Sequence, residues 1–127
     1  NDGDDLRTRL IDSFQQFNQH ESAISERFLA RLAELEGVTL LGRDEANSEF
    51  RTPTFALTFE NHSPEEIAKK LGKRNICVWN GHFYALGLVR QLGLEESGGV
   101  VRIGFMHYNT LEEVDILFDE LKLILGQ

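Results

Sequence analysis

The chain has 127 residues, of which 41% are hydrophobic and 27% charged, and its formal net charge is −8. This length and composition predict one globular domain with its own core. The negative charge argues against nucleic acid or an anionic membrane as a partner, because both are bound through basic patches. No apolar run approaches the roughly 20 residues that span a bilayer. Cys77 is the single cysteine, so we expect a cytoplasmic location and no internal disulfide.

The first part of the chain predicts one long helix. After a polar, acidic lead-in at residues 1–5, apolar side chains recur mostly three or four positions apart over residues 6–35. This is the spacing of one face of an amphipathic helix. We expect a bend near residues 19–22, a C-cap at Gly37, and a first half that overhangs the rest of the fold. Asn1 is not an initiating residue, so we expect the chain to be a fragment or a processed product.

The middle of the chain predicts short strands and helices in alternation. Ser63, Pro64 and Glu66 together indicate a helix start: the serine caps, the proline suits the first helical position and the glutamate completes a capping box. Asn80-Gly81 is a turn signal. The expected elements are strands over residues 38–41, 54–59 and 75–79, and helices over residues 64–72 and 83–92.

The end of the chain predicts a buried strand that leads directly into a helix. Residues 100–105 are apolar except for Arg102, and a polar corner at residues 107–109 follows. Thr110 and Glu113 form a capping box. The helix residues expected to face the core are Val114, Leu117, Phe118, Leu121 and Ile124. The whole order predicts an α+β fold: a two-layer sandwich with a small, mostly antiparallel sheet covered by helices.

Arg102 is the first candidate binding residue. An arginine in an otherwise apolar strand is costly unless an anion meets it. Two interpretations stay open at this point. The guanidinium pairs with one of the chain's many carboxylates, or it presents its fork of donors to the carboxylate of a substrate.

A polar and aromatic corner provides further candidates. Trp79, Asn80, His82 and Tyr84 place an indole, an amide, an imidazole and a phenol where a strand ends. They either fill the core around a simple turn or line a ligand cleft. In the second case we expect the cleft to include Arg102 and the corner at residues 107–109.

Other reactive side chains give weaker signals. The four histidines show no metal-binding spacing, and there is no cysteine pair, so we expect no metal site. Cys77 alternates with apolar neighbours in an expected strand, which favours a buried, inert thiol over a nucleophile.

Several stretches carry a family resemblance: residues 75–85 (NICVWNGHFYA), 88–93 (LVRQLG) and 101–115 (VRIGFMHYNTLEEVD), supported by residues 51–55 and 62–66. Together they resemble the C-terminal small domain of class V aminotransferases. Within that class they are most similar to the cysteine desulfurase-like branch of pyridoxal-phosphate enzymes. The resemblance covers nearly the whole chain.

The resemblance implies roles for single residues. Arg102 matches the arginine that binds the substrate α-carboxylate, and His82 matches a histidine beside the cofactor. Tyr84 stands where one group of cysteine desulfurases carries the catalytic cysteine, and Trp79 stands where they carry a second arginine. These two departures argue against persulfide chemistry. We expect Asn80 to line the same pocket.

The resemblance also implies a missing partner. In the family, the lysine that holds pyridoxal phosphate lies in a large N-terminal domain, and nothing here matches that domain. We therefore expect residues 1–127 to be the small domain of an enzyme that acts on a small amino acid, is usually a homodimer, and is inactive without its large domain. The alternative is a stand-alone interaction module that keeps the fold and offers the apolar stripe of the first helix to a partner protein.

Overall fold

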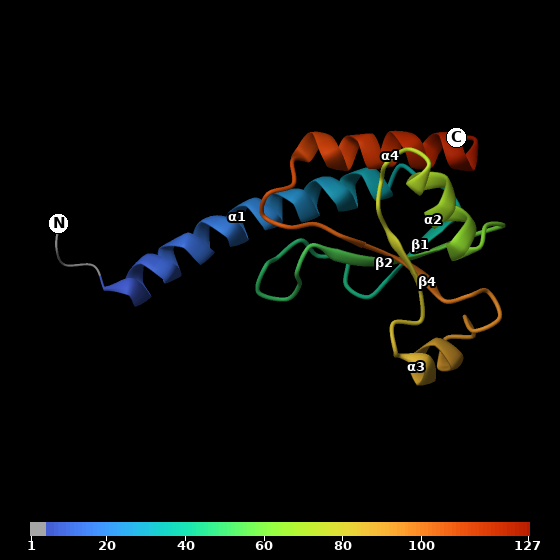
Figure 1. The fold of residues 1–127 in the computed structure, drawn as a ribbon, viewed down its shortest axis with the longest axis horizontal. Helices are drawn as coiled ribbons and strands as arrows, with labels where there is room; N and C mark the ends of the chain where they lie inside the picture. Colours follow the sequence, from blue (N-terminus) through green and yellow to red (C-terminus); the bar gives the residue numbers. More distant parts are fainter. Residues whose placement is uncertain (1–4) are drawn as a thin grey trace.

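The computed structural model describes residues 5–127, so most of the acidic lead-in, residues 1–4, lies outside the described part. The described chain folds into helices and short strands in alternation (Figure 1). In order they are α1 (Leu6–Leu32), β1 (Val38–Leu41), β2 (Thr54–Phe59), α2 (Pro64–Gly72), β3 (Trp79–Gly81), α3 (Leu86–Gln91), β4 (Val100–Gly104) and α4 (Leu111–Leu125).

The strands form one open sheet in the order β1-β2-β4-β3, and every neighbouring pair is antiparallel. Helices α1 and α4 lie side by side over one face, where α2 also contacts α4 (Figure 1). Helix α3 lies on the other side of the sheet from α4. The predicted α+β sandwich with an antiparallel sheet is therefore confirmed.

The core lies between the sheet and these helices. Phe55 and Leu57 of β2 and Ile103 of β4 point into it, whereas the alternate residues of both strands point outward. Phe28 of α1 stacks on Phe55 with ring centres 3.7 Å apart. The strands thus bury one face and leave the other face partly open, as antiparallel sheets commonly do.

Helix α1 extends well past the sheet at its N-terminal end (Figure 1). It is capped by Asp5, whose carboxylate accepts the Thr8 backbone N–H at 2.8 Å. The helix runs without interruption to Leu32, so the expected helical end at residue 35 is three residues too late. The expected glycine cap is also wrong, because the cap is Ala33 in an αR conformation. Gly37 instead takes a φ of 69° in the turn toward β1.

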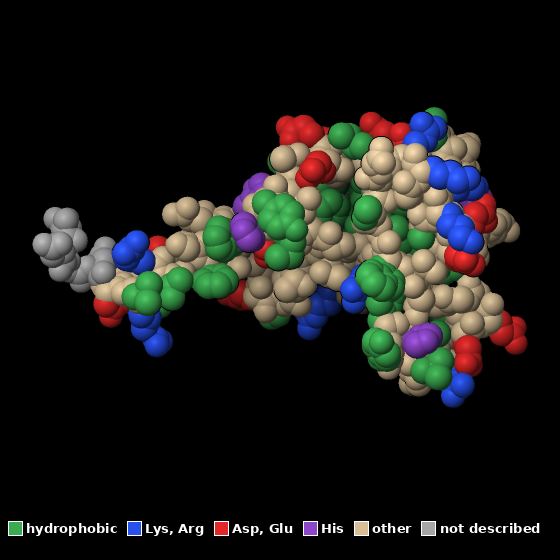
Figure 2. Space-filling view, viewed as in Figure 1, with side chains coloured by type: hydrophobic (Ala, Val, Ile, Leu, Met, Phe, Trp, Pro, Cys, Tyr) green, Lys and Arg blue, Asp and Glu red, His purple; other side chains and the backbone are tan. Residues whose placement is uncertain are grey.

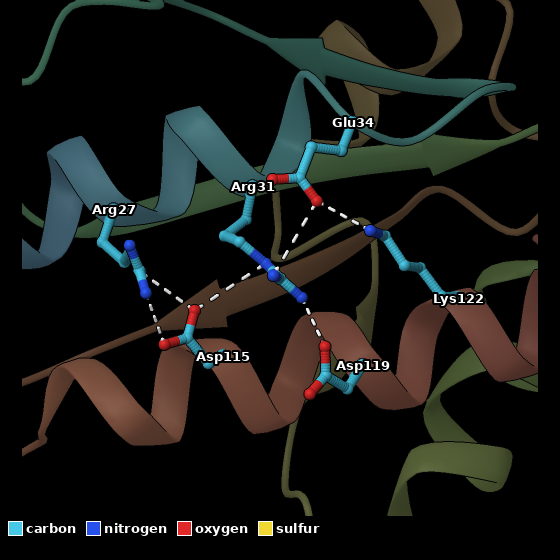
Figure 3. A network of polar contacts seen from close by, with 6 residues as sticks. All are labelled: Arg27, Arg31, Glu34, Asp115, Asp119 and Lys122. Carbon is cyan, nitrogen blue, oxygen red and sulfur yellow. Dashed lines mark hydrogen bonds and ion pairs between the residues drawn. The ribbon is translucent and has the colours of Figure 1, made fainter.

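An ion-pair network joins α1 to α4 (Figure 3). Arg27 donates two hydrogen bonds to the Asp115 carboxylate, at 2.9 and 2.7 Å. Arg31 pairs with Asp119 and lies 3.8 Å from both Asp115 and Glu34. Lys122 Nζ donates to Glu34 at 2.7 Å. The network fixes the register of the two helices outside the apolar core.

The segment around β3 differs most from the sequence-based expectation. The strand covers Trp79–Gly81 rather than residues 75–79, so Asn80-Gly81 belongs to the strand and the turn follows it. Pairing with β4 decides these bounds, since Trp79 lies opposite Arg102 and Gly81 opposite Val100. Helix α3 begins at Leu86 rather than at residue 83, because Phe83 and Tyr84 have φ values of 52° and 62° and so cannot belong to a right-handed helix.

Candidate functional site

A hollow of about 510 Å³ lies at the corner that follows β3. It brings together all five residues that the sequence singled out as a binding site, together with Gly81 and Phe83. Its lining residues are Trp79, Asn80, Gly81, His82, Phe83, Tyr84 and Arg102. The side chains are aromatic or polar, and Arg102 provides the one full charge.

The sheet register explains why these residues meet. Trp79 and Arg102 are direct partners in the antiparallel β3–β4 pair, and side chains opposite each other in such a pair project from the same face. That face is the one turned away from α1 and α4, because Val101 and Ile103 on either side of Arg102 point into the core. Arg102 is therefore exposed, and the expectation of a fully buried strand is wrong on this face.

Arg102 forms no ion pair with any carboxylate of residues 5–127. Its guanidinium carbon instead lies 4.4 Å from the centre of the Phe83 ring. This is cation–π geometry. A guanidinium covered on one face keeps the N–H groups at its edge free to donate to a carboxylate. Of the two interpretations left open by the sequence, the internal ion pair is excluded for the described residues.

Phe83 is a site residue that the sequence analysis missed. It has a φ of 52°, and Tyr84 after it has a φ of 62°. Two successive non-glycine residues in the left-handed region are strained, and such strain gathers at functional sites. The Tyr84 N–H donates to His82 Nδ1 at 3.2 Å, and the Ala85 N–H donates to the His82 carbonyl at 2.8 Å. The only signal for Phe83 in the sequence is its position between the candidates His82 and Tyr84.

The corner at residues 107–109 does not join this hollow. Antiparallel pairing puts the end of β3 beside the start of β4, whereas this corner follows the end of β4. His107 stacks on Phe17 of α1 with ring centres 4.2 Å apart, and the Asn109 carbonyl is 2.7 Å from His20 Nε2. The expectation of one shared cleft is therefore wrong, and the corner anchors α1 instead.

Cys77 and the possible metal ligands are the other reactive side chains in the described part of the chain. Cys77 is exposed rather than buried, because it precedes β3 and alternates with Ile76 and Val78, which pack on the core. Within residues 5–127, no three His, Cys, Asp or Glu side chains gather as metal ligands. No helix in this range is both long and apolar enough to cross a bilayer.

The comparisons with known proteins agree with this fold. Residues 10–117 match the family model described as Aminotransferase class-V. The chain belongs to the class V aminotransferase family. It is 36% identical over 110 residues to a probable cysteine desulfurase of Mycobacterium leprae, covering 87% of this chain and 17% of that protein. It is 31% identical over 109 residues to the aminotransferase-like protein FGM3 of Gibberella zeae, covering 84% and 27%.

A solved structure is similar over nearly the whole of this chain. The apo cysteine desulfurase of Thermococcus onnurineus superposes with a TM-score of 0.78 at 28% identity, covering 94% of this chain and 29% of that one. A NifS-like protein of Rickettsia africae, at 19% identity and a TM-score of 0.76, supports the fold alone. This chain spans less than a third of each of these relatives.

The family uses pyridoxal phosphate, held as a Schiff base on a lysine, and the residues of this chain do not fit that role. The four lysines are Lys69, Lys70, Lys73 and Lys122, and none lines the hollow. Three of them pair with glutamates at 2.7 Å on helix surfaces. None of the four lysines is therefore placed to hold the cofactor at this hollow.

Proposed function

We propose that this chain is the substrate-side small domain of a pyridoxal-phosphate-dependent class V enzyme, with Arg102 as the residue that binds the α-carboxylate of an amino acid. The observation that carries the proposal is the free edge of the Arg102 guanidinium, held on Phe83 in a hollow without an acidic residue. An arginine that the fold leaves unpaired beside strained backbone is suited to an anionic ligand.

The other lining residues complete the proposed pocket. His82 provides a hydrogen-bonding side chain, and Trp79 and Tyr84 provide aromatic surfaces. Asn80 also lines the hollow, but it lies opposite the core residue Val101, so its side chain is on the other face of the sheet. The large domain of the same polypeptide would supply the cofactor and its lysine, and closure of the two domains would exclude water from the bound substrate. Alone, the chain is proposed to bind but not to catalyse. A cytoplasmic location and a dimeric parent remain predictions.

Substitution of Arg102 in the full-length protein tests this proposal. We expect Arg102→Leu to raise the KM for the amino-acid substrate about 100-fold, since a charged bidentate hydrogen bond is lost, while the absorbance of the bound cofactor stays unchanged. Arg90→Leu is the matched control, because Arg90 is an exposed arginine paired with Glu95 outside the hollow. Unchanged kinetics in Arg102→Leu would refute the proposed role.

The alternative, a non-catalytic interaction module, is favoured by one observation. The overhanging part of α1 exposes Leu6, Leu10 and Phe14 to solvent, by 71%, 49% and 60%, and hydrophobic side chains are visible along it in Figure 2. Exposed apolar stripes on helices are common docking surfaces. A full-length protein that binds no pyridoxal phosphate would favour this alternative over the enzyme.

A further inference from the structure

We infer that the hollow around Arg102 takes a carboxylate ligand with an aromatic side chain, rather than the small amino acid expected from the sequence. The inference rests on the proposed function, since it assumes that Arg102 receives the carboxylate. It goes further by naming the chemical class of the ligand's other end.

The walls of the hollow provide the first reason. Trp79 is 68% exposed and the Tyr84 side chain projects fully into solvent. Trp79 stands directly across from Arg102 in the sheet, so its indole and the guanidinium share one face. Two large aromatic side chains left uncovered beside a single cation provide a surface on which a ring can stack. A ligand as small as alanine would bind Arg102 without contacting these surfaces.

The charges of the hollow provide the second reason. Aromatic walls also attract cations, so a ligand with a basic side chain has to be considered. Arg102 would repel such a side chain, and no Asp or Glu among residues 5–127 lines the hollow to offset the repulsion. An acidic side chain would compete with the α-carboxylate for the one guanidinium. An uncharged aromatic group is therefore the side chain that the lining fits best.

The position of Phe83 provides the third reason. Its ring covers one face of the guanidinium, so a carboxylate approaches Arg102 at its edge. The hollow beside that edge is lined by Trp79 and by the turn at residues 82–84. A ring joined to the carboxylate can therefore contact an aromatic side chain next to Arg102.

Trp79 makes the inference directly testable, because it is the single tryptophan of the chain and reports on its own surroundings. We would titrate the 127-residue chain with phenylalanine, with alanine, which lacks the ring, and with phenethylamine, which lacks the carboxylate, and follow tryptophan fluorescence. We expect a saturable change with phenylalanine and binding at least about tenfold weaker for each truncated ligand. Arg102→Gln should lose phenylalanine binding, and Arg90→Gln should retain it.

The outcomes separate this inference from the proposed function. Equal binding of alanine and phenylalanine would overturn the aromatic ligand and leave Arg102 as a carboxylate site. Equal binding of phenethylamine and phenylalanine would overturn the role of Arg102 as well. A lack of any saturable change with phenylalanine would overturn the inference alone, because the kinetics of Arg102→Leu in the full-length protein judge the proposed function independently.

Discussion

Gly99 lies against the backbone of Gly81 so closely that a β-carbon at position 99 would overlap the Gly81 carbonyl oxygen. The contact joins the loop before β4 to the end of β3, at the edge of the hollow. Gly99 also has a φ of 89°, a conformation that L residues with side chains rarely adopt. The position of the Arg102 site therefore depends on Gly99, a glycine that does not itself line the hollow.

Gly99→Ala should destabilise the chain by more than its backbone conformation alone requires. Gly98→Ala is a matched control, because Gly98 has a φ of 90° but a β-carbon there would meet only Pro64, at 4.0 Å. Backbone strain should cost each variant about 1–3 kcal/mol, and the overlap should add at least about 1 kcal/mol to Gly99→Ala. Urea denaturation of both variants measures the difference. Equal losses of stability would show that the loop moves freely away from β3.

Arg31 should contribute more to stability than Arg27, although Arg27 makes the better hydrogen bonds. The Arg31 side chain is only 18% exposed and lies near Asp115 and Asp119 of α4 and Glu34 just after α1, whereas Arg27 is 49% exposed. We expect Arg31→Met to cost about 1–3 kcal/mol of unfolding free energy and Arg27→Met no more than about 1 kcal/mol. Denaturation at low and high salt checks this. A loss for Arg31→Met as small as that for Arg27→Met would indicate that the aliphatic part of the Arg31 side chain, and not its charge, provides the stabilisation.

The stability of the chain should fall on the acid side. Arg27 lowers the pKa of Asp115, Lys122 lowers the pKa of Glu34, and the Asn109 amide lowers the pKa of Glu113, each chiefly through a side-chain hydrogen bond. A carboxylate whose pKa is lower in the folded state than in the unfolded state stabilises the folded state at pH values above the ordinary carboxyl pKa of about 4. This stabilisation is lost as the pH falls through the lowered value.

Thermal unfolding between pH 7 and pH 3 measures this dependence. The midpoint should be level down to about pH 5 and then decrease. Arg27→Met serves as the control, because it returns Asp115 toward its ordinary pKa and should make the acid slope shallower. An identical slope in wild type and Arg27→Met would show that the pair with Asp115 contributes nothing to the pH dependence.

The elements best predicted from the sequence are those with local signals. The start of α2 at Ser63 and the start of α4 at Thr110 follow from capping residues and their partners three positions later, and both caps are present. These interactions join residues within one turn, so the sequence contains all the information that fixes them.

The elements predicted least well depend on contacts between distant residues. The bounds of β3 follow from its pairing with β4, which comes later in the chain, whereas the apolar character of residues 76–78 predicts that they belong to the strand. The exposure of Arg102 could not be foreseen for a similar reason: its neighbours Val101 and Ile103 suggested burial on both faces, and only the layers of the fold show that one face is open. Phe83 was missed because its backbone conformation leaves no local signature.

Truncation of two phenylalanines on the same helix should have very different effects on stability. Phe28 is fully buried, stacks on Phe55 and meets Phe118 edge-on with ring centres 4.9 Å apart, whereas Phe14 is 60% exposed. Phe28→Ala should lower the unfolding free energy by about 3–5 kcal/mol, because it leaves a cavity between α1 and the sheet. Phe14→Ala should change it by no more than about 0.5 kcal/mol.

Chemical denaturation at two protein concentrations measures both effects. A dependence of the Phe14→Ala effect on concentration would contradict this prediction, because it would mean that a second copy covers the overhanging part of α1. If Phe14→Ala is neutral in this chain but destabilises the full-length protein, the exposed stripe of α1 packs on residues outside the chain. That result would favour the domain of a larger enzyme over a free-standing interaction module.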